Sequence, residues 1–289
     1  LGLLLAGCAP AAGPTATPKS AAPAPAKVPV AETPAPKPAA PSPTPKPAAE
    51  QPRYGGVLTI PHAMDPQTLD MHQEEGYETE NVVQCAYNGI TQMDSNNPEE
   101  VIGDLAKSWE ASKDGLTFIF RLHEGVKFHD GTPCTAEDVQ FSFERMTRPP
   151  RGIRSPRSAD LAAVDKIEAP DKNTIKFTLK YPFSPFMDVI SSGFMVIYSK
   201  AFVEKKGHMK YDVMGTGPYK LKSYATGTSL DYVRNPDYFV KGHPYLDGIT
   251  FYIIRDATTR LAAFRTGRVK LTNPGVTQLT PADAEIIKK

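Results

Sequence analysis

Alternating apolar and polar positions predict a series of half-buried β-strands along most of the chain. Residues 116–122 carry the strongest case, with Leu116, Phe118, Phe120 and Leu122 on one face, which is the period of a strand with one buried side. Similar alternation, or a short apolar run beside turn residues, predicts further strands at 57–60, 126–128, 164–168, 174–179, 219–224, 229–234 and 249–254. The third and fourth of these, and the fifth and sixth, are close enough to form hairpins.

Apolar residues at helical spacing predict helices between these strands. One covers residues 81–91, where Val82, Val83, Ala86 and Ile90 share a face. A second begins after Thr135, with Asp138 completing an acidic variant of the capping box. Two more open at Ser184–Pro185 and at Asp256, the last ending at Gly267. Strands and helices in mixed order, with no internal repeat, predict an α/β or α+β fold class.

The first 52 residues have a different character. Fourteen of the 29 prolines lie between Pro10 and Pro52, and residues 9–52 contain no aromatic side chain. Such a segment buries too little apolar surface to offset the entropy lost on ordering. We therefore expect residues 9–52 to form a disordered, extended stalk rich in alanine and proline, ahead of a folded body that begins near Tyr54.

Residues 1–8 read LGLLLAGC, an apolar run that resembles the end of a secretory signal. Its close, ending in Cys8, resembles a bacterial lipobox, where the signal is cut before the cysteine. The resemblance implies lipidation of Cys8 and anchoring to the outer face of the cytoplasmic membrane, in the periplasm or at the cell surface. The alternative is an ordinary signal in which LAGC occurs by chance.

Charge and motif content narrow the possible functions. The net charge is +1, from 33 basic and 32 acidic residues, which gives no electrostatic reason to bind nucleic acid. The chain has no run of about 18 apolar residues that could span a membrane. No GxSxG, P-loop or post-strand GxGxxG is present, and the six histidines lack zinc-site spacing. We therefore expect a binding protein that is not an enzyme, without cofactor or metal.

The sequence allows more than one role for a few side chains. Cys85 and Cys134 could pair in an oxidising compartment or remain buried free thiols. His129–Asp130 could serve acid–base chemistry, although its place before Gly131 indicates a structural turn. Trp109 could stack on a ligand, but packing within the protein is the simpler interpretation.

Residues 105–145 carry a family resemblance. They read LAKSWEASKDGLTFIFRLHEGVKFHDGTPCTAEDVQFSFER, which is similar to the signature of the family 5 extracellular solute-binding proteins. Shorter matches follow in the family's order: 55–58, 69–70, 169–171, 215–219, 234–238 and 246–249. The chain departs from the family pattern at Met71, at Cys134 and at Lys270, where an acidic residue is usual.

The resemblance implies a two-lobed periplasmic-binding-protein-like fold. Residues 53–255 would form the first lobe, with an inserted subdomain at about 80–185, and residues 256–289 would begin a second lobe that is truncated here. The solute-contacting segments would be Glu75, Gly76 and Tyr77, and the loop at Thr216 and Gly217.

The same resemblance implies a function in transport. A monomer would capture oligopeptides or dipeptides by hinge closure and deliver them to the permease subunits of an ABC transporter. Open alternatives are a nickel chelate, haem or an oligosaccharide as the solute, or a ligand sensor at the cell surface.

Overall fold

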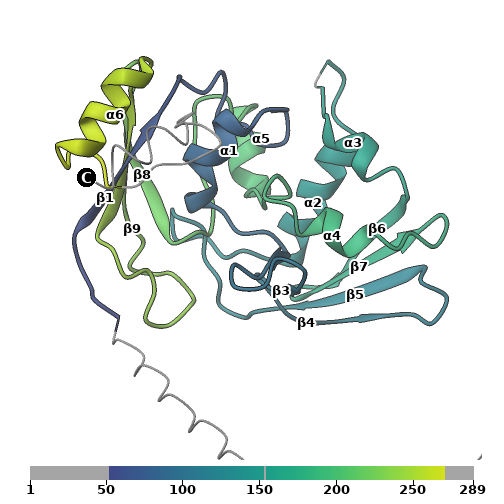
Figure 1. The fold of residues 1–289 in the computed structure, drawn as a ribbon. Helices are drawn as coiled ribbons and strands as arrows, with labels where there is room; N and C mark the ends of the chain where they lie inside the picture. Colours follow the sequence, from purple (N-terminus) through teal and green to yellow (C-terminus); the bar gives the residue numbers. More distant parts are fainter. Residues whose placement is uncertain (1–51, 153, 271–289) are drawn as a thin grey trace, which may run out of the picture. The chain divides into compact units, whose positions relative to one another are not determined.

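The computed structural model describes residues 52–152 and 154–270. The predictions for the lipobox, for Cys8, for nearly all of the stalk and for residues 271–289 lie outside the described residues. The described part has a mixed α/β architecture, which confirms the fold class (Figure 1).

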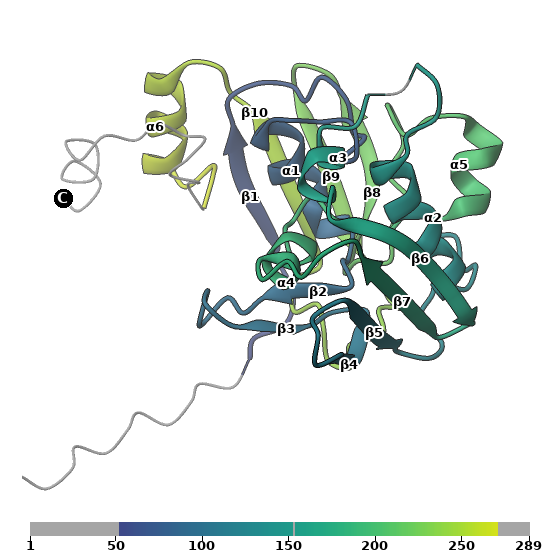
Figure 2. The ribbon, with the colours of Figure 1, turned by 90° about the vertical axis from the view of Figure 1, so that its right-hand side faces the viewer.

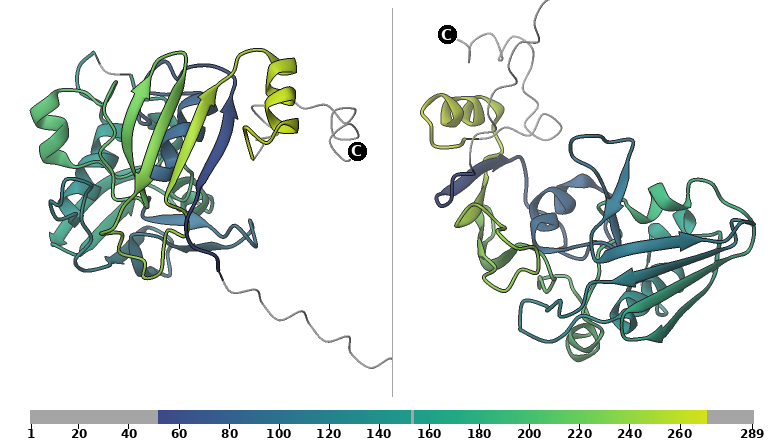
Figure 3. Two further views of the ribbon diagram at one scale, coloured as in Figure 1. Left: turned by 90° about the vertical axis from the view of Figure 1, so that its left-hand side faces the viewer. Right: turned by 90° about the horizontal axis from the view of Figure 1, so that it is seen from below.

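A four-stranded mixed sheet has the order β1-β10-β9-β8. Its strands are β1 (Val57–His62), β8 (Tyr219–Ala225), β9 (Ser229–Arg234) and β10 (Gly248–Ile253). β1 and β10 are parallel, so the first described strand lies beside the last described one (Figure 3), whereas β8, β9 and β10 are antiparallel neighbours. In β10 the buried Ile249, Phe251 and Ile253 alternate with the partly exposed Thr250 and Tyr252, as the sequence predicts.

A four-stranded antiparallel sheet has the order β4-β5-β7-β6 (Figure 2). Its strands are β4 (Ala106–Ala111), β5 (Thr117–Leu122), β6 (Val164–Asp171) and β7 (Thr174–Leu179). Phe118 and Phe120 of β5 face Phe177 and Ile175 of β7 across the ladder, so one side of this sheet is apolar. A small ladder of β2 (Thr91–Met93) and β3 (Val101–Gly103) leads into it.

Helices lie between and beside the two sheets. They are α1 (Tyr77–Val83), the 3-10 turn η1 (Gln84–Ala86), α2 (Ala136–Thr147), α3 (Arg157–Asp160), α4 (Phe186–Ile190), α5 (Lys200–Lys206) and α6 (Ala257–Arg265). Within residues 52–152 and 154–270, none of them has the length and hydropathy needed to cross a membrane.

Two hydrophobic clusters form the interior. The first gathers the apolar face of the antiparallel sheet and one face of α2. The second gathers the mixed sheet, α1 and the segments around Leu69 and Tyr198. Helix α2 contacts both the first cluster and the chain segment around Tyr198. It does so through two buried faces, one apolar and one polar.

One face of α2 is apolar and the other is polar. Val139, Phe143 and Met146 are fully buried in the first cluster. On the adjacent face, about 100° around the helix, Asp138 accepts a hydrogen bond from the Lys200 backbone N–H at 3.0 Å, and Ser142 Oγ accepts one from the Tyr198 N–H at 2.9 Å. The helix therefore joins the antiparallel sheet to the chain segment that belongs to the second cluster.

Most predicted strands are present, but the segments around residues 84–93 and 126–128 differ from prediction. The expected helix at 81–91 is wrong in its bounds: α1 begins at Tyr77 and the chain leaves the helix after Ala86. The reason is non-local, because Gly89 and Ile90 carbonyls accept hydrogen bonds from Leu105 and Ala106 N–H groups. The expected strand at 126–128 is a single bridge between Lys127 and Pro133.

The predicted helix caps are largely present. The Thr135 N–H donates to Asp138 Oδ2 at 2.9 Å, and Asp256 Oδ1 accepts from the Thr259 N–H at 2.7 Å. The helix expected at Ser184–Pro185 begins at Phe186. Of the two cysteine alternatives the structure has the free thiols, since neither Cys85 nor Cys134 is paired.

Candidate functional site

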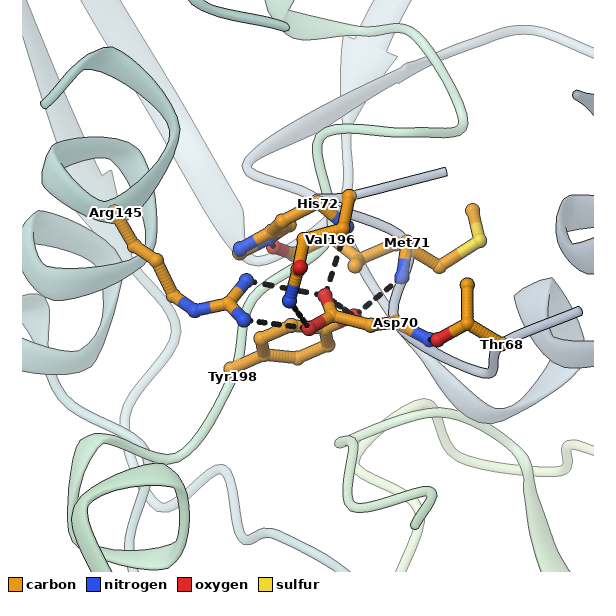
Figure 4. A network of polar contacts seen from close by, with 8 residues as sticks. Thr68, Asp70, Met71, His72, Arg145, Val196 and Tyr198 are labelled. Carbon is orange, nitrogen blue, oxygen red and sulfur yellow. Dashed lines mark hydrogen bonds and ion pairs between the residues drawn. The ribbon is translucent and has the colours of Figure 1, made fainter. Parts of the chain in front are cut away.

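A buried polar network anchors the segment that follows β1 (Figure 4). Asp70 Oδ1 and Oδ2 accept from the two terminal nitrogens of Arg145 at 3.0 and 2.5 Å. The same carboxylate accepts from Gln73 Nε2 at 2.6 Å, from the His72 N–H at 3.1 Å and from the Tyr198 hydroxyl at 3.3 Å. Asp70 is fully buried and Arg145 is 7% exposed, so this is a charge pair inside the protein with its carboxylate saturated by donors.

The network also sets the protonation of its members. Burial raises the pKa of Asp70, but the hydrogen bonds and charge of Arg145 outweigh it, so the pKa lies below its usual value. Burial, together with the charge of Arg145, lowers the pKa of His72 to about 4. His72 is therefore a neutral imidazole at physiological pH, stacked on the Tyr198 ring at 4.1 Å between centroids. Its Nε2 lies 2.8 Å from the Val196 carbonyl oxygen.

The anchored segment presents the first predicted solute-contacting group. Glu75 and Tyr77 are exposed, and Gly76 caps the N-terminus of α1. Glu75 forms a 2.5 Å ion pair with Arg154, in which both side chains are largely exposed. Tyr77 is 66% exposed and its ring lies 5.7 Å from that of Phe194. The structure thus places all three residues at the surface, beside the network rather than inside it.

A cavity of about 610 Å³ opens next to α1. Its walls come from β1 and β10 of the mixed sheet, from α1 and η1, from residues 87–92, and from residues 191–196. Asn81 of α1 and Gln84 of η1 line it, and Asn81 lies about one helical turn beyond Tyr77. Tyr77 therefore begins the helix that supplies part of the cavity wall, but it is not itself a lining residue.

Part of the cavity wall is polar and not used by the fold. Among the described residues, no hydrogen bond or ion pair involves the side chains of Gln84, Gln92 or Ser192, although all three line the cavity. By contrast, Thr91 and Ser191 are hydrogen-bonded to each other at 2.9 Å. Side-chain amides and hydroxyls that are not engaged elsewhere can donate to or accept from a bound solute.

Asp104 is the cavity's acidic group. Its Oδ1 accepts from Asn88 Nδ2 at 2.6 Å and its Oδ2 accepts from the Gly89 N–H at 2.8 Å. Burial raises the pKa of Asp104 to about 7, against the opposing effect of these two hydrogen bonds.

The second predicted contact group is packed inside the protein. Thr216 is 1% exposed and its hydroxyl donates to Asn88 Oδ1 at 2.9 Å. The Gly217 N–H donates to the Ala86 carbonyl at 3.0 Å, and a Cβ on Gly217 would lie 2.4–2.7 Å from the Ala86 and Tyr87 backbone. This loop supports the cavity wall from behind, and sequence reasoning did not identify Asn88, Asp104 or Gln84 as wall residues.

The other candidate residues, His129 and Trp109, make contacts within the protein. The His129 N–H donates to the Gly215 carbonyl at 2.9 Å and its Nε2 lies 3.1 Å from the Gly217 oxygen. The Trp109 ring is 37% exposed and stacks on Phe120 with 6.4 Å between centroids. Over the described ranges, no group of three His, Cys, Asp or Glu residues could hold a metal ion.

The fold identifies the class of protein. The described elements are arranged as in the two-lobed periplasmic binding proteins, as solved structures show. The chain belongs to the family described as bacterial extracellular solute-binding proteins, family 5, whose middle region it matches over residues 100–289. This confirms the family resemblance of residues 105–145.

Three similar proteins illustrate the relationship. The probable D,D-dipeptide-binding periplasmic protein DdpA of Escherichia coli K12 is 34% identical over 74% of this chain and 42% of its own length. DppA from Helicobacter pylori, solved with the peptide STSA, is 29% identical with a TM-score of 0.70, over 76% of this chain and 47% of its own. AgaA from A. tumefacien R10, solved with agropinic acid, is 29% identical with a TM-score of 0.70, over 75% and 43%. The chain therefore spans less than half the length of each of these three relatives.

Removing the cation from the Asp70 network should destabilise the protein strongly. Arg145→Met leaves a buried carboxylate without its counter-charge, which costs about 3–5 kcal/mol in the free energy of unfolding. Arg121→Met is the matched control, since its pair with Glu110 is exposed and should contribute under about 1 kcal/mol. Urea unfolding at pH 7 measures both, and equal small losses would contradict a central role for the pair. The double variant Asp70→Asn, Arg145→Met should recover part of the loss.

Stability should also fall as the pH is lowered through the range set by His72. The pKa is about 4 in the folded protein and 6.5 when unfolded, so below pH 6.5 the unfolded state binds the proton first. The expected loss between pH 6.5 and 4 is about 3 kcal/mol. His72→Gln removes this titration while keeping a donor for the Val196 carbonyl.

Urea unfolding across that pH range should give a flatter profile for His72→Gln than for the unchanged protein. His129, whose pKa burial also lowers to about 4, titrates in both proteins and drops out of the difference. Parallel profiles would show that His72 does not contribute.

Proposed function

We propose that this chain forms the first wall of a solute-binding cleft in an extracytoplasmic protein that captures oligopeptides or dipeptides. The observation that carries the proposal is the 610 Å³ cavity, with the unengaged side chains of Gln84, Gln92 and Ser192 in its wall. A wall in which amides and hydroxyls outnumber its one described carboxylate, Asp104, suits the main-chain amides of a peptide. Relatives named for dipeptide binding and for a bound peptide support the same class of solute.

In this proposal the solute is enclosed by hinge closure and passed to an ABC-type permease, with no catalysis. Lipidation of Cys8 would tether the protein, as a monomer, to the outer face of the cytoplasmic membrane. Glu75, Gly76 and Tyr77 would contact the solute directly. Thr216 and Gly217 would act through Asn88 and the backbone of residues 86–87, by holding the wall in position.

A second candidate solute has a specific basis. AgaA, as similar to this chain as the peptide-bound DppA, was solved with agropinic acid. The same cavity could therefore serve a small non-peptide organic acid in place of a peptide.

The test is a thermal-shift screen of the intact protein that carries this chain, with Cys8 replaced by serine. Peptide pools, sugars, organic acids and nickel are compared. A solute at 100 times its Kd should raise the free energy of unfolding by about 2.7 kcal/mol, which gives a clear rise in melting temperature. A rise with peptides supports the proposal, a rise with organic acids alone favours the second candidate, and no rise with any solute contradicts both.

Truncating Tyr77 should weaken binding without weakening the fold. Its side chain is 66% exposed, so Tyr77→Ala removes little packing, but loss of an aromatic contact at a binding surface typically costs about tenfold in affinity. Tyr181→Ala is the control, because Tyr181 is 50% exposed and lies in the turn between β7 and α4. Calorimetric titration with a peptide found in the screen measures both; equal affinities would remove Tyr77 from the contact surface.

A further inference from the structure

The loop of residues 215–218 borders the cavity and is tied to its wall. Pro218 lines the cavity, and the Thr216 hydroxyl donates to Asn88, which also lines it. The Gly217 N–H donates to a backbone carbonyl of η1 at 3.0 Å. A displacement of this loop would therefore move residues that a solute in the cavity meets.

His129, in the turn after Phe128, holds the same loop at both of its glycines. Its N–H donates to the Gly215 carbonyl at 2.9 Å, and its ring Nε2 lies 3.1 Å from the Gly217 carbonyl oxygen. A carbonyl oxygen only accepts, so in the neutral ring Nε2 carries the proton and Nδ1 does not. Nδ1 is buried and has no hydrogen-bond partner among the described residues. The neutral ring therefore suits this position, with its one donor in use.

A protonated His129 ring suits the position poorly. Protonation would add an N–H at the buried Nδ1, where it has no acceptor, and a buried donor without a partner is costly. Lys220 on β8 brings a positive charge, since its Nζ donates to the His129 carbonyl at 3.0 Å. The opposing carboxylates are Asp130 of the same turn and Asp237, which lies 4.0 Å from Lys220 Nζ. Burial is the largest effect, and with Lys220 it lowers the pKa of His129 to about 4.

We propose that His129 is a positioning residue, which holds residues 215–218 against the cavity wall while its ring is neutral and releases them when the ring is protonated. The effect on a solute rests on the proposed function, whereas attachment of the loop is a property of the protein alone. The pKa is about 4 with the loop attached and returns towards 6.5 when the ring reaches water. Attachment is therefore favoured above pH 6.5 and weakens as the pH falls towards 4.

Hydrogen–deuterium exchange of the Gly217 amide measures this attachment, on the intact protein with Cys8 replaced by serine. The Gly217 N–H is bonded to the Ala86 carbonyl when the loop is attached, and release exposes it to solvent. Its protection, corrected for the intrinsic exchange rate, should fall about 20-fold between pH 7 and pH 5. Amides of β7, in the antiparallel sheet, are the reference for opening of the whole fold.

Two variants of His129 separate its hydrogen bond from its titration. His129→Gln keeps a side-chain N–H for the Gly217 carbonyl but has no titrating ring, so protection of the Gly217 amide should persist at pH 7 and stay nearly flat down to pH 5. His129→Leu removes the donor and should lower that protection about tenfold at both pH values. His123→Gln is the control, because the His123 ring contacts Phe239 and not the loop. The unchanged protein and His129→Gln decide the matter if His129→Leu does not fold.

Calorimetric titration with a peptide found in the screen connects the loop to the solute. At pH 7, His129→Leu should bind that peptide about tenfold more weakly than the unchanged protein, and His129→Gln should restore most of the affinity. Equal pH profiles of Gly217 protection in the unchanged protein and His129→Gln, or unchanged affinity in His129→Leu, overturn the inference. If no peptide binds while the exchange profiles differ as expected, attachment of the loop by His129 is supported and peptide capture is contradicted.

Discussion

The buried pair of Asp70 and Arg145 is the interaction on which the rest of the structure depends. Asp70 lies between Leu69 and Met71 of the second hydrophobic cluster, whereas Arg145 belongs to α2, whose apolar face completes the first. Taking both charges out of water is costly unless the remaining hydrogen-bonding capacity is filled. Here Gln73, the His72 N–H and the Tyr198 hydroxyl fill it, so the two clusters are joined at a point that tolerates little displacement.

That junction fixes the register of the segment leading to the candidate site. Three residues after His72 the chain reaches Glu75, and α1 begins at Tyr77. Because α1 carries Asn81 into the cavity wall, its position follows from the anchored segment before it. The loop at Thr216 and Gly217 holds the other end of this wall through Asn88 and Ala86. These contacts hold the cavity wall in position. The polar side chains that line the cavity and make no hydrogen bond among the described residues remain available to a solute.

Sequence reasoning succeeded where the signal is local and failed where it is not. Alternation along β5, β7 and β10 indicates that one face of each strand is buried. The caps at Thr135 and Asp256 depend only on hydrogen bonds to residues three positions further along the chain. On α2, however, Asp138, Ser142 and Arg145 have the spacing of a solvent face and are nevertheless buried. Their partners lie 56 to 75 residues away in sequence, which no local pattern reveals. The strand β4, exposed along most of its length, likewise exists because β5 pairs with it.

The same distinction explains why the candidate site was only partly predictable. Family resemblance pointed to Glu75, Gly76 and Tyr77, which lie at the start of α1 and are not among the residues that line the cavity. It also pointed to Thr216, whose hydroxyl the structure gives to Asn88. A resemblance predicts segments near a solute, but only the packing shows which side chains of a segment are exposed and which are held inside the protein. Among the described residues, no hydrogen bond involves the side chains of Gln84, Gln92 and Ser192, so we expect their exchange to cost little stability. Under the proposed function, solute preference can therefore change in this wall while the Asp70 network keeps its geometry constant.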